Sequence, residues 1–169
     1  MTRILILTRH AKSAWDDISL GDHERPLNKR GRRSAQAIGA WLRKRGYLPD
    51  QVISSDAVRT RETWTQMSAE MGQAGGDPTF TRSLYLAPAQ HILANLRQAS
   101  GRVVLLLGHN PGIAEFAGQI VDEAPAHARF FDYPTGATTV IEFARDTWGD
   151  IGWHQGEVLD FIVPRELTD

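Results

Sequence analysis

Apolar residues follow two patterns along the chain: short continuous runs, and longer stretches with helical spacing. The continuous runs lie at residues 3–8, 51–54 and 102–107. Short continuous runs are typical of strands that are buried on both faces, as in parallel sheets. We therefore expect a buried strand at each of these three places.

A helical pattern follows the first two runs. Residues 29–45 carry apolar side chains at helical spacing, between Asn28 as an N-cap and Gly46 as a stop. A second helix is expected at about residues 57–71, with Asp56 as its N-cap. Each buried strand would therefore lead into a helix.

The stretch after the third run also predicts a helix. Asn110 can cap it and Pro111 suits its first position, ahead of further apolar residues at helical spacing. Four shorter elements are expected elsewhere, namely a strand at 79–82, a helix at 88–97, and two antiparallel strands at 138–143 and 157–163.

The alternation of strands and helices predicts the fold class. We expect a three-layer α/β/α fold, with an open, mostly parallel sheet, helices on both faces and an antiparallel pair near the C-terminus. Neither a repeat nor a low-complexity linker interrupts the pattern, so residues 1–169 are expected to form a single domain. In such sheets ligands bind at the carboxyl ends of the strands.

Composition narrows the class of protein. The chain has no cysteine, which excludes disulfides, thiolate metal sites and a cysteine nucleophile. No apolar run approaches the roughly 20 residues that span a bilayer, so no membrane partner is expected. The apolar run that begins at residue 4 is also too short for the core of a signal peptide, and a cytoplasmic location is the default expectation.

The net charge of −1 conceals an uneven distribution. Residues 1–61 carry a net charge of +7, and residues 62–169 carry −8. Charged surfaces can simply segregate, or the basic part can steer an anionic ligand. The basic stretch at residues 29–33 lacks interleaved aromatic residues, so nucleic acid is not expected as a partner.

Polar side chains follow each of the three buried strands. Arg9 and His10 follow the first strand, Ser55 and Arg59 the second, and His109 the third. Because these strand ends should meet at one edge of the sheet, we expect the side chains to converge, where helix N-termini also favour anions.

Two imidazoles and two guanidiniums suit phosphoryl transfer. His10, as a neutral imidazole, could attack phosphorus, and His109 could stabilise charge on the transferring group. Arg9 and Arg59 offer planar forks that match phosphate oxygens. A metal site on the two histidines is an alternative, but the guanidiniums would repel a cation and no carboxylate is placed as a third ligand.

Four short segments carry these residues in order along the chain. They are RHAKS at 9–13, RPLNKRG at 25–31, SSDAVRTRET at 54–63 and GHNP at 108–111. Together they resemble the signatures of the histidine phosphatase superfamily, also called the phosphoglycerate mutase-like family. The match runs from residue 3 to about residue 144, and the small size and the RHAKS segment look most like the short bacterial phosphohistidine phosphatase branch.

The resemblance implies a metal-independent phosphatase that needs no cofactor and forms a phosphohistidine intermediate on His10. It also implies that Arg9, Arg59 and His109 complete the phosphate pocket. Ser13 and Asn110 are expected to contact the substrate together with the two arginines. The backbone at residues 135–137 is a further candidate for the pocket.

The sequence departs from the family at the leaving-group acid. Many larger members carry a glutamate for this step, but residues 84–91 contain no acid. Asp16, Asp22 and Glu24, in the loop after His10, could serve instead. A missing acid favours a phosphoramidate such as phosphohistidine on a protein, because its imidazole can be protonated before it leaves.

Other functions remain open at this point. The same scaffold could carry a phosphatase for a small phosphorylated molecule or a mutase, or it could be a non-catalytic phosphoprotein-binding module. A binding module would need the arginines but not both histidines. The remaining histidines, at positions 23, 91, 127 and 154, are expected to be ordinary surface or core residues.

Overall fold

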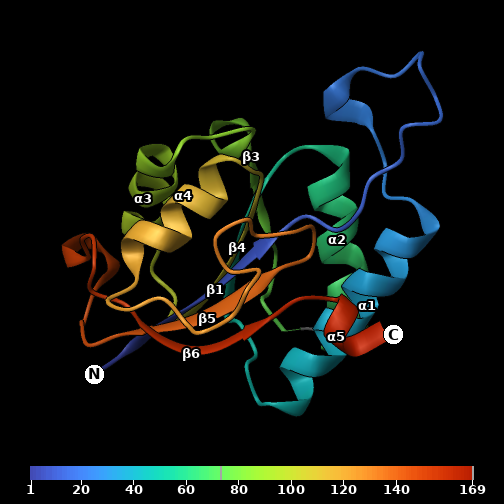
Figure 1. Cartoon of the computed structure of the whole chain (residues 1–169). Coiled ribbons are helices and arrows are strands. Elements are labelled where there is room, and N and C mark those ends of the chain that lie inside the picture. The colour runs from blue at the N-terminus through green and yellow to red at the C-terminus, as the bar shows by residue number, and fades with distance from the viewer. Residues whose placement is uncertain (73, 169) are drawn as a thin grey trace.

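The computed structural model describes residues 1–72 and 74–168 of the chain. A six-stranded sheet with the order β3-β2-β4-β1-β5-β6 forms its centre (Figure 1). The strands are β1 (Arg3–Arg9), β2 (Gln51–Ser55), β3 (Thr79–Thr81), β4 (Val103–Gly108), β5 (Thr138–Phe143) and β6 (Glu157–Ile162). The first four run parallel, whereas β5 is antiparallel to β1 and β6 is antiparallel to β5.

Helices cover both faces of the sheet, which confirms the predicted fold class. They are α1 (Lys29–Lys44), α2 (Val58–Ala69), α3 (Ala89–Arg97), α4 (Gly112–Ile120) and the short α5 (Arg165–Thr168). α1 packs against α2, α3 packs against α4, and α5 lies against α1. None of the helices within the described residues is long and apolar enough to cross a membrane.

Side chains of β1 alternate between the two halves of the core. Leu5 and Leu7 belong to the cluster that includes the apolar faces of α3 and α4, whereas Ile6 belongs to the cluster that includes those of α1 and α2. All three are fully buried. This explains the unbroken apolar run, because a central parallel strand buries both of its faces.

The start of α1 is fixed as the sequence predicts. The side chain of Asn28 accepts a hydrogen bond from the backbone N–H of Gly31 at 2.8 Å. Gly31 also lies so close to Lys12 that a Cβ at this position would be 2.0 Å from the carbonyl oxygen of Lys12. The first turn of α1 is therefore held against the chain that leaves β1.

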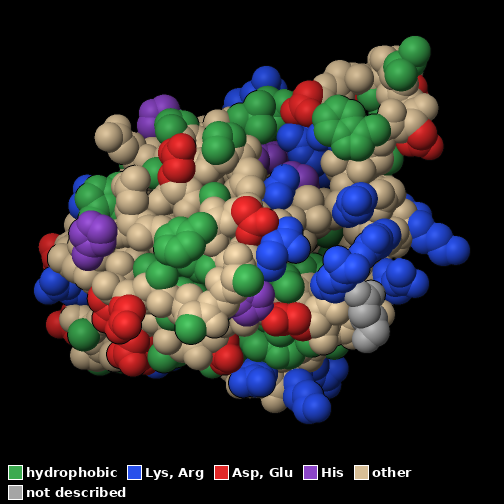
Figure 2. Space-filling view, in the orientation of Figure 1, with side chains coloured by type: hydrophobic (Ala, Val, Ile, Leu, Met, Phe, Trp, Pro, Cys, Tyr) green, Lys and Arg blue, Asp and Glu red, His purple; other side chains and the backbone are tan. Residues whose placement is uncertain are grey.

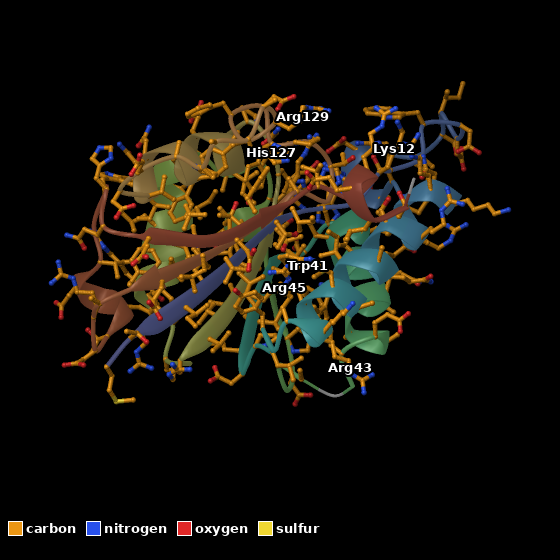
Figure 3. The ribbon with its side chains drawn as sticks, turned by 60° about the horizontal axis from the view of Figure 1, so that its bottom comes forward. Lys12, Trp41, Arg43, Arg45, His127 and Arg129 are labelled. Atoms are coloured by element: carbon orange, nitrogen blue, oxygen red, sulfur yellow. The ribbon has the colours of Figure 1, made fainter. Side chains whose placement is uncertain are left out.

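Arg43 lies in the last turn of α1, at the opposite end from Gly31 (Figure 3).

Two predicted N-caps are wrong. α2 begins at Val58 after Ala57, and the carboxylate of Asp56 instead lies 2.7 Å from Nε2 of His23. α4 begins at Gly112 after Pro111, without a side-chain cap. An N-cap contributes only about 1 kcal/mol, so a tertiary partner can draw the side chain away.

Asn110 shows the same effect. Its Nδ2 donates to the carbonyl oxygens of Asp132 and Tyr133, at 3.0 and 3.1 Å. The other predicted elements lie within two residues of their observed bounds. The strand predicted at 79–82 ends at Thr81, because the Thr81 hydroxyl accepts a hydrogen bond from the N–H of Ser83 and begins a 3-10 turn.

Candidate active site

The register of adjacent parallel strands brings the two site histidines together. Arg9 at the end of β1 pairs with Gly108 at the end of β4. The N–H of His10 donates to the carbonyl oxygen of Gly108 at 3.1 Å. The rings of His10 and His109 follow directly, with their centroids 5.3 Å apart. The convergence expected from the strand ends is therefore present.

His10 is held as a neutral imidazole with one defined tautomer. Its side chain is buried, and its Nδ1 lies 2.7 Å from the carbonyl oxygen of Ala11. Because a carbonyl oxygen only accepts hydrogen bonds, Nδ1 must carry the proton and Nε2 keeps its lone pair. Burial holds the pKa of His10 well below its ordinary value, against the opposing effect of the Ala11 hydrogen bond, and His109, Arg9 and Arg59 lower it further. These conditions suit a nucleophile.

His109 is held by the end of β2. Its Nε2 lies 2.8 Å from Oγ of Ser55, which already accepts a hydrogen bond from the N–H of Ala57. Ser55 can donate its hydroxyl proton to Nε2, and in that tautomer Nδ1 of His109 carries the N–H. Among the described residues, this buried Nδ1 has no hydrogen-bond partner. A bound oxyanion would supply one and remove the cost of the unpaired donor.

Burial and the charge of Arg59 lower the pKa of His109 to about 3. His109 is therefore neutral in the free site at neutral pH. It can donate one N–H to a transferring group, but it does not begin as an imidazolium. The surroundings of His109 therefore favour a neutral N–H donor to the transferring group.

Both predicted arginines are close to the histidines. Arg59 is 2% exposed, and its two terminal nitrogens donate to the carbonyl oxygen and to the carboxylate of Asp22, at 2.7 and 3.0 Å. Arg9 donates to the carbonyl oxygen of Tyr133 at 3.1 Å. Within the described part of the chain, the buried Nε atoms of Arg9 and Arg59 have no partner.

Positive charge is therefore concentrated around the pocket, with Asp22 as the ion-pair partner of Arg59. Burial, and then the charge of Arg59, lowers the pKa of Arg9. An anion between the two guanidiniums would offset both the burial of their charge and their mutual repulsion, because charge-assisted hydrogen bonds are strong in buried surroundings.

These side chains line one pocket of about 300 Å³. Figure 2 shows histidine side chains in a hollow bordered by Lys and Arg. The lining residues are Arg9, His10, Lys12, Ser13, Trp15, Arg25, Arg59, Leu86, His109, Asn110 and Thr135. All six residues predicted to act on or bind the substrate are among them.

Ser13 and Asn110 already have partners in the pocket. Oγ of Ser13 accepts a hydrogen bond from Arg25 at 2.6 Å. Asn110 uses its Nδ2 to hold the loop before β5, while its buried Oδ1 is unpaired among the described residues. The same loop reaches β1 through the N–H of Gly136, which donates to the carbonyl oxygens of Arg9 and His10. Gly136 has a φ of +77°, which favours glycine.

The sequence did not assign a role to Arg25 or Trp15. Arg25 is buried and donates to Ser13 and Asp22, and its guanidinium lies 3.4 Å from the centre of the Trp15 ring. Trp15 itself is 74% exposed and forms part of the pocket rim. Arg25 opens the RPLNKRG segment, and its place in that motif is the sequence signal for its role.

The loop carboxylates are not placed as leaving-group acids. Asp22 accepts hydrogen bonds from Arg25, Arg59 and the hydroxyl of Tyr85. Burial alone would raise the pKa of Asp22, but the hydrogen bonds from Tyr85 and Arg59 lower it to about 2. Asp22 is thus ionised at neutral pH and holds Arg59. Asp16 and Glu24 are exposed, and no Asp or Glu is among the described residues that line the pocket.

His23 lies nearer the site than the sequence indicated. Its ring stacks edge-on against Tyr85 with the centroids 4.8 Å apart, and Tyr85 packs edge-on against His109. In the described part of the chain, no three His, Cys, Asp or Glu side chains are grouped as metal ligands would be.

Comparison with known proteins identifies the family of the chain. A model of the histidine phosphatase superfamily (branch 1) matches residues 5–80. An uncharacterised chloroplast protein of Arabidopsis thaliana is 38% identical over 130 residues, which cover 71% of this chain and 60% of that protein. An uncharacterised Mycobacterium tuberculosis protein is 30% identical over 93% of this chain and 99% of its own length.

The chain belongs to the histidine phosphatase superfamily, as its motifs indicated. A 2,3-bisphosphoglycerate-dependent phosphoglycerate mutase of Methylorubrum populi is 34% identical over 77 residues, which cover 44% of this chain and 36% of that protein. In structure this chain is similar to a Nakamurella multipartitia protein assigned as the phosphohistidine phosphatase SixA. The two have a TM-score of 0.80 and 28% identity, and the match covers 97% of each chain.

Proposed function

We propose that this protein is a phosphatase in which Nε2 of His10 accepts the phosphoryl group, and that its substrate is phosphohistidine on a protein. One observation carries the proposal most directly. His10 is neutral, its Nδ1 is tied to the Ala11 carbonyl, and its ring lies beside His109 in a pocket with Arg9 and Arg59. A nucleophile, two equatorial cations and a further N–H donor are thus within one cavity.

The first step transfers the phosphoryl group to the enzyme. The lone pair on Nε2 of His10 forms a bond to phosphorus as the bond from phosphorus to the leaving nitrogen breaks. The bonding electrons go to that nitrogen. Nδ1 of His10 keeps its proton, which remains hydrogen-bonded to the Ala11 carbonyl oxygen. Arg9, Arg59 and the N–H of His109 stabilise the charge on the phosphoryl oxygens.

The second step restores the enzyme. A water oxygen attacks the phosphorus of phosphorylated His10, the N–P bond breaks, and Nε2 regains its lone pair. Inorganic phosphate leaves with the oxygen of that water and one of its protons, and the other proton goes to solvent. No metal or cofactor is needed for this balance.

The lack of a proton donor in the pocket supports phosphohistidine as the substrate. Asp22 is ionised and bound to Arg59, and the described residues that line the pocket include no carboxyl group. An alkyl phosphate would need an acid for its leaving oxygen. A phosphohistidine that is protonated on its second nitrogen leaves as neutral imidazole and needs none.

The test compares two substrates on the wild-type protein. A phosphohistidine peptide should turn over at least about 100-fold faster in kcat/KM than a simple alkyl phosphate, the range over which general acid catalysis acts. Rapid acid-free quenching with a labelled substrate should trap the label on His10, located by peptide mapping. Faster turnover of the alkyl phosphate would contradict the assigned substrate and favour a small-molecule phosphomonoesterase. A sugar acid phosphate that isomerises without releasing phosphate would indicate a mutase.

A further inference from the structure

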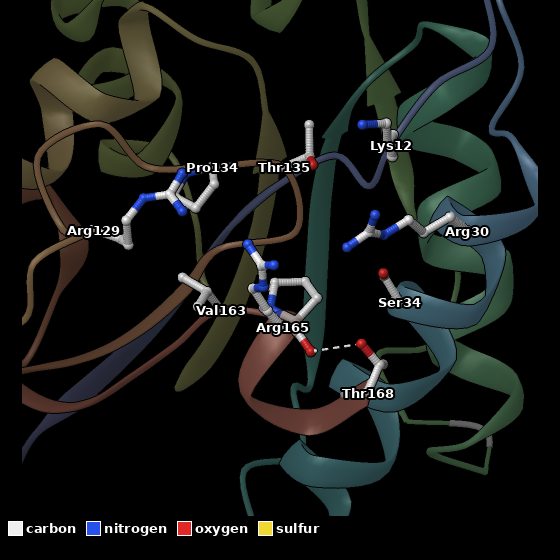
Figure 4. A pocket seen from close by; sticks show the side chains of 10 residues that line it. Lys12, Arg30, Ser34, Arg129, Pro134, Thr135, Val163, Arg165 and Thr168 are labelled. Atoms are coloured by element: carbon white, nitrogen blue, oxygen red, sulfur yellow. Dashed lines mark hydrogen bonds between the residues drawn. The ribbon is translucent and has the colours of Figure 1, made fainter.

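A second cavity, of about 260 Å³, adjoins the phosphate pocket (Figure 4). The two cavities share Lys12 and Thr135 in their walls. The lining of the second cavity is Lys12, Arg30, Ser34, Arg129, Pro134, Thr135, Val163, Pro164, Arg165 and Thr168. We refer to it as the basic cavity.

Four cationic side chains from separate segments meet in the basic cavity. Lys12 follows β1, Arg30 is in the first turn of α1, Arg129 precedes β5, and Arg165 begins α5. Figure 4 shows the side chains of Arg30 and Arg165 directed toward the same space. These four residues are 18 to 153 positions apart in the sequence, so the fold brings them together and no local pattern does.

Counter-charges are scarce in this lining. Arg129 has an ion pair with Asp132 at 2.9 Å. Among the described residues, Lys12 and Arg30 have no carboxylate within ion-pair distance, and no Asp or Glu lines the basic cavity. Lys12 and Arg30 thus bring like charges together in the lining, so an oxyanion bound between them would be favoured.

The remaining lining residues suit the same ligand. Ser34 is buried and offers a hydroxyl donor, while Val163 and Pro164 form a buried apolar wall. An apolar wall excludes water and strengthens electrostatic interactions beside it. Guanidinium groups bind a carboxylate or a phosphate through paired hydrogen bonds.

We propose that the basic cavity binds a second anionic group of the same substrate, the carboxylate of an acidic residue close to the phosphohistidine. The inference rests on the proposed function, since the phosphoryl group must occupy the neighbouring pocket. Lys12 and Thr135 line both cavities, so one substrate can occupy the two cavities together. Selectivity for acidic sequence around the phosphohistidine is the consequence.

The test uses two phosphohistidine peptides. The acidic peptide has Asp and Glu beside the phosphohistidine, and the neutral peptide has Asn and Gln at the same positions. The wild-type protein should show a higher kcat/KM for the acidic peptide. Arg30→Gln should lower that preference roughly fivefold, which is the upper range for one exposed charge pair. The matched control is Arg43→Gln, which removes the same charge at the far end of α1 (Figure 3) and should keep the preference.

A binding measurement separates this inference from the proposed function. Calorimetric titration with the unphosphorylated acidic peptide needs no turnover, and Arg30→Gln should bind it more weakly than Arg43→Gln does. Equal binding by the two variants, or equal kcat/KM of the wild-type protein for both peptides, would overturn the inference. Loss of all turnover together with retained Arg30-dependent binding would contradict only the proposed chemistry. A doubly phosphorylated peptide preferred over the acidic one would identify phosphate as the second anion and overturn the carboxylate assignment.

Discussion

The phosphate pocket and the basic cavity contain the same kinds of cation in different surroundings. Arg59 is 2% exposed and fixed by Asp22, whereas Lys12 and Arg30 are exposed side chains at the edge of their cavity. Buried guanidiniums have few conformations and weak screening, so they can orient a reacting group. Exposed cations are mobile and screened by salt, so they can adjust affinity but cannot position an atom for reaction.

The phosphate pocket and the basic cavity adjoin each other, but we expect substitutions in them to change different steps of the reaction. Substitutions in the phosphate pocket should change the chemical step, because its groups meet the transferring phosphoryl. Substitutions in the basic cavity should change selectivity among substrates. Four experiments test this division.

The largest effect is expected for His10→Ala. Turnover of a phosphohistidine peptide should fall at least about 1,000-fold, because the covalent route is lost, and labelled phosphate should no longer be trapped on the protein. The control is His91→Ala, which changes an exposed histidine on α3 outside both cavities. Residual activity close to wild type would show that His10 is not the nucleophile.

Arg59→Ala should follow, with a loss of about 2–4 kcal/mol of transition-state stabilisation measured from kcat/KM. Arg59→Lys should recover only part of the loss, because an ammonium cannot form the paired hydrogen bonds of a guanidinium. Arg61→Ala is the matched control on the same helix, since the Arg61 side chain donates to the Asp56 carbonyl and lies over Phe80 instead. An equal loss for Arg61→Ala would assign the effect to the helix and not to the pocket.

The buried histidines should also make stability depend on pH. The pKa of His109 is about 3 in the folded protein against 6.5 for an exposed histidine. Between these values the unfolded chain binds more protons, so the free energy of unfolding should fall as the pH drops from about 6.5 toward 3. His109 contributes a slope of up to about 1.4 kcal/mol per pH unit.

Urea unfolding at pH 7 and at pH 4 measures this dependence. His109→Gln should flatten it, whereas His91→Gln should leave it as in the wild-type protein. An unchanged slope in His109→Gln would mean that His109 is not held neutral by the fold.

The smallest effect separates the two regions by their response to salt. The roughly fivefold loss from Arg30→Gln on an acidic peptide should vanish near 1 M salt, where charges are screened over about 3 Å. The loss from Arg59→Ala should persist there, because the pocket is buried. Both are read from kcat/KM at low and high salt. A salt-resistant effect of Arg30→Gln would place that residue with the catalytic groups.

The sequence by itself determined the layers of the fold and the composition of the site. Continuous apolar runs and helical spacing are local signals, and they placed the predicted elements within two residues of their observed bounds. The rule that parallel strands end at one edge then joined Arg9, His10, Arg59 and His109, although they are far apart along the chain. Local periodicity and one topological rule were enough for this step.

Only the tertiary structure decided how these groups are used. The Ala11 carbonyl fixes the tautomer of His10, and Ser55 holds the ring of His109 through Nε2. Asp22 is occupied by Arg59 and Tyr85, and Asp56 and Asn110 leave the helix ends for distant partners. These outcomes depend on hydrogen bonds and burial between segments that are remote in the sequence. Local patterns do not contain such contacts, so neither the protonation states nor the basic cavity could be predicted from them.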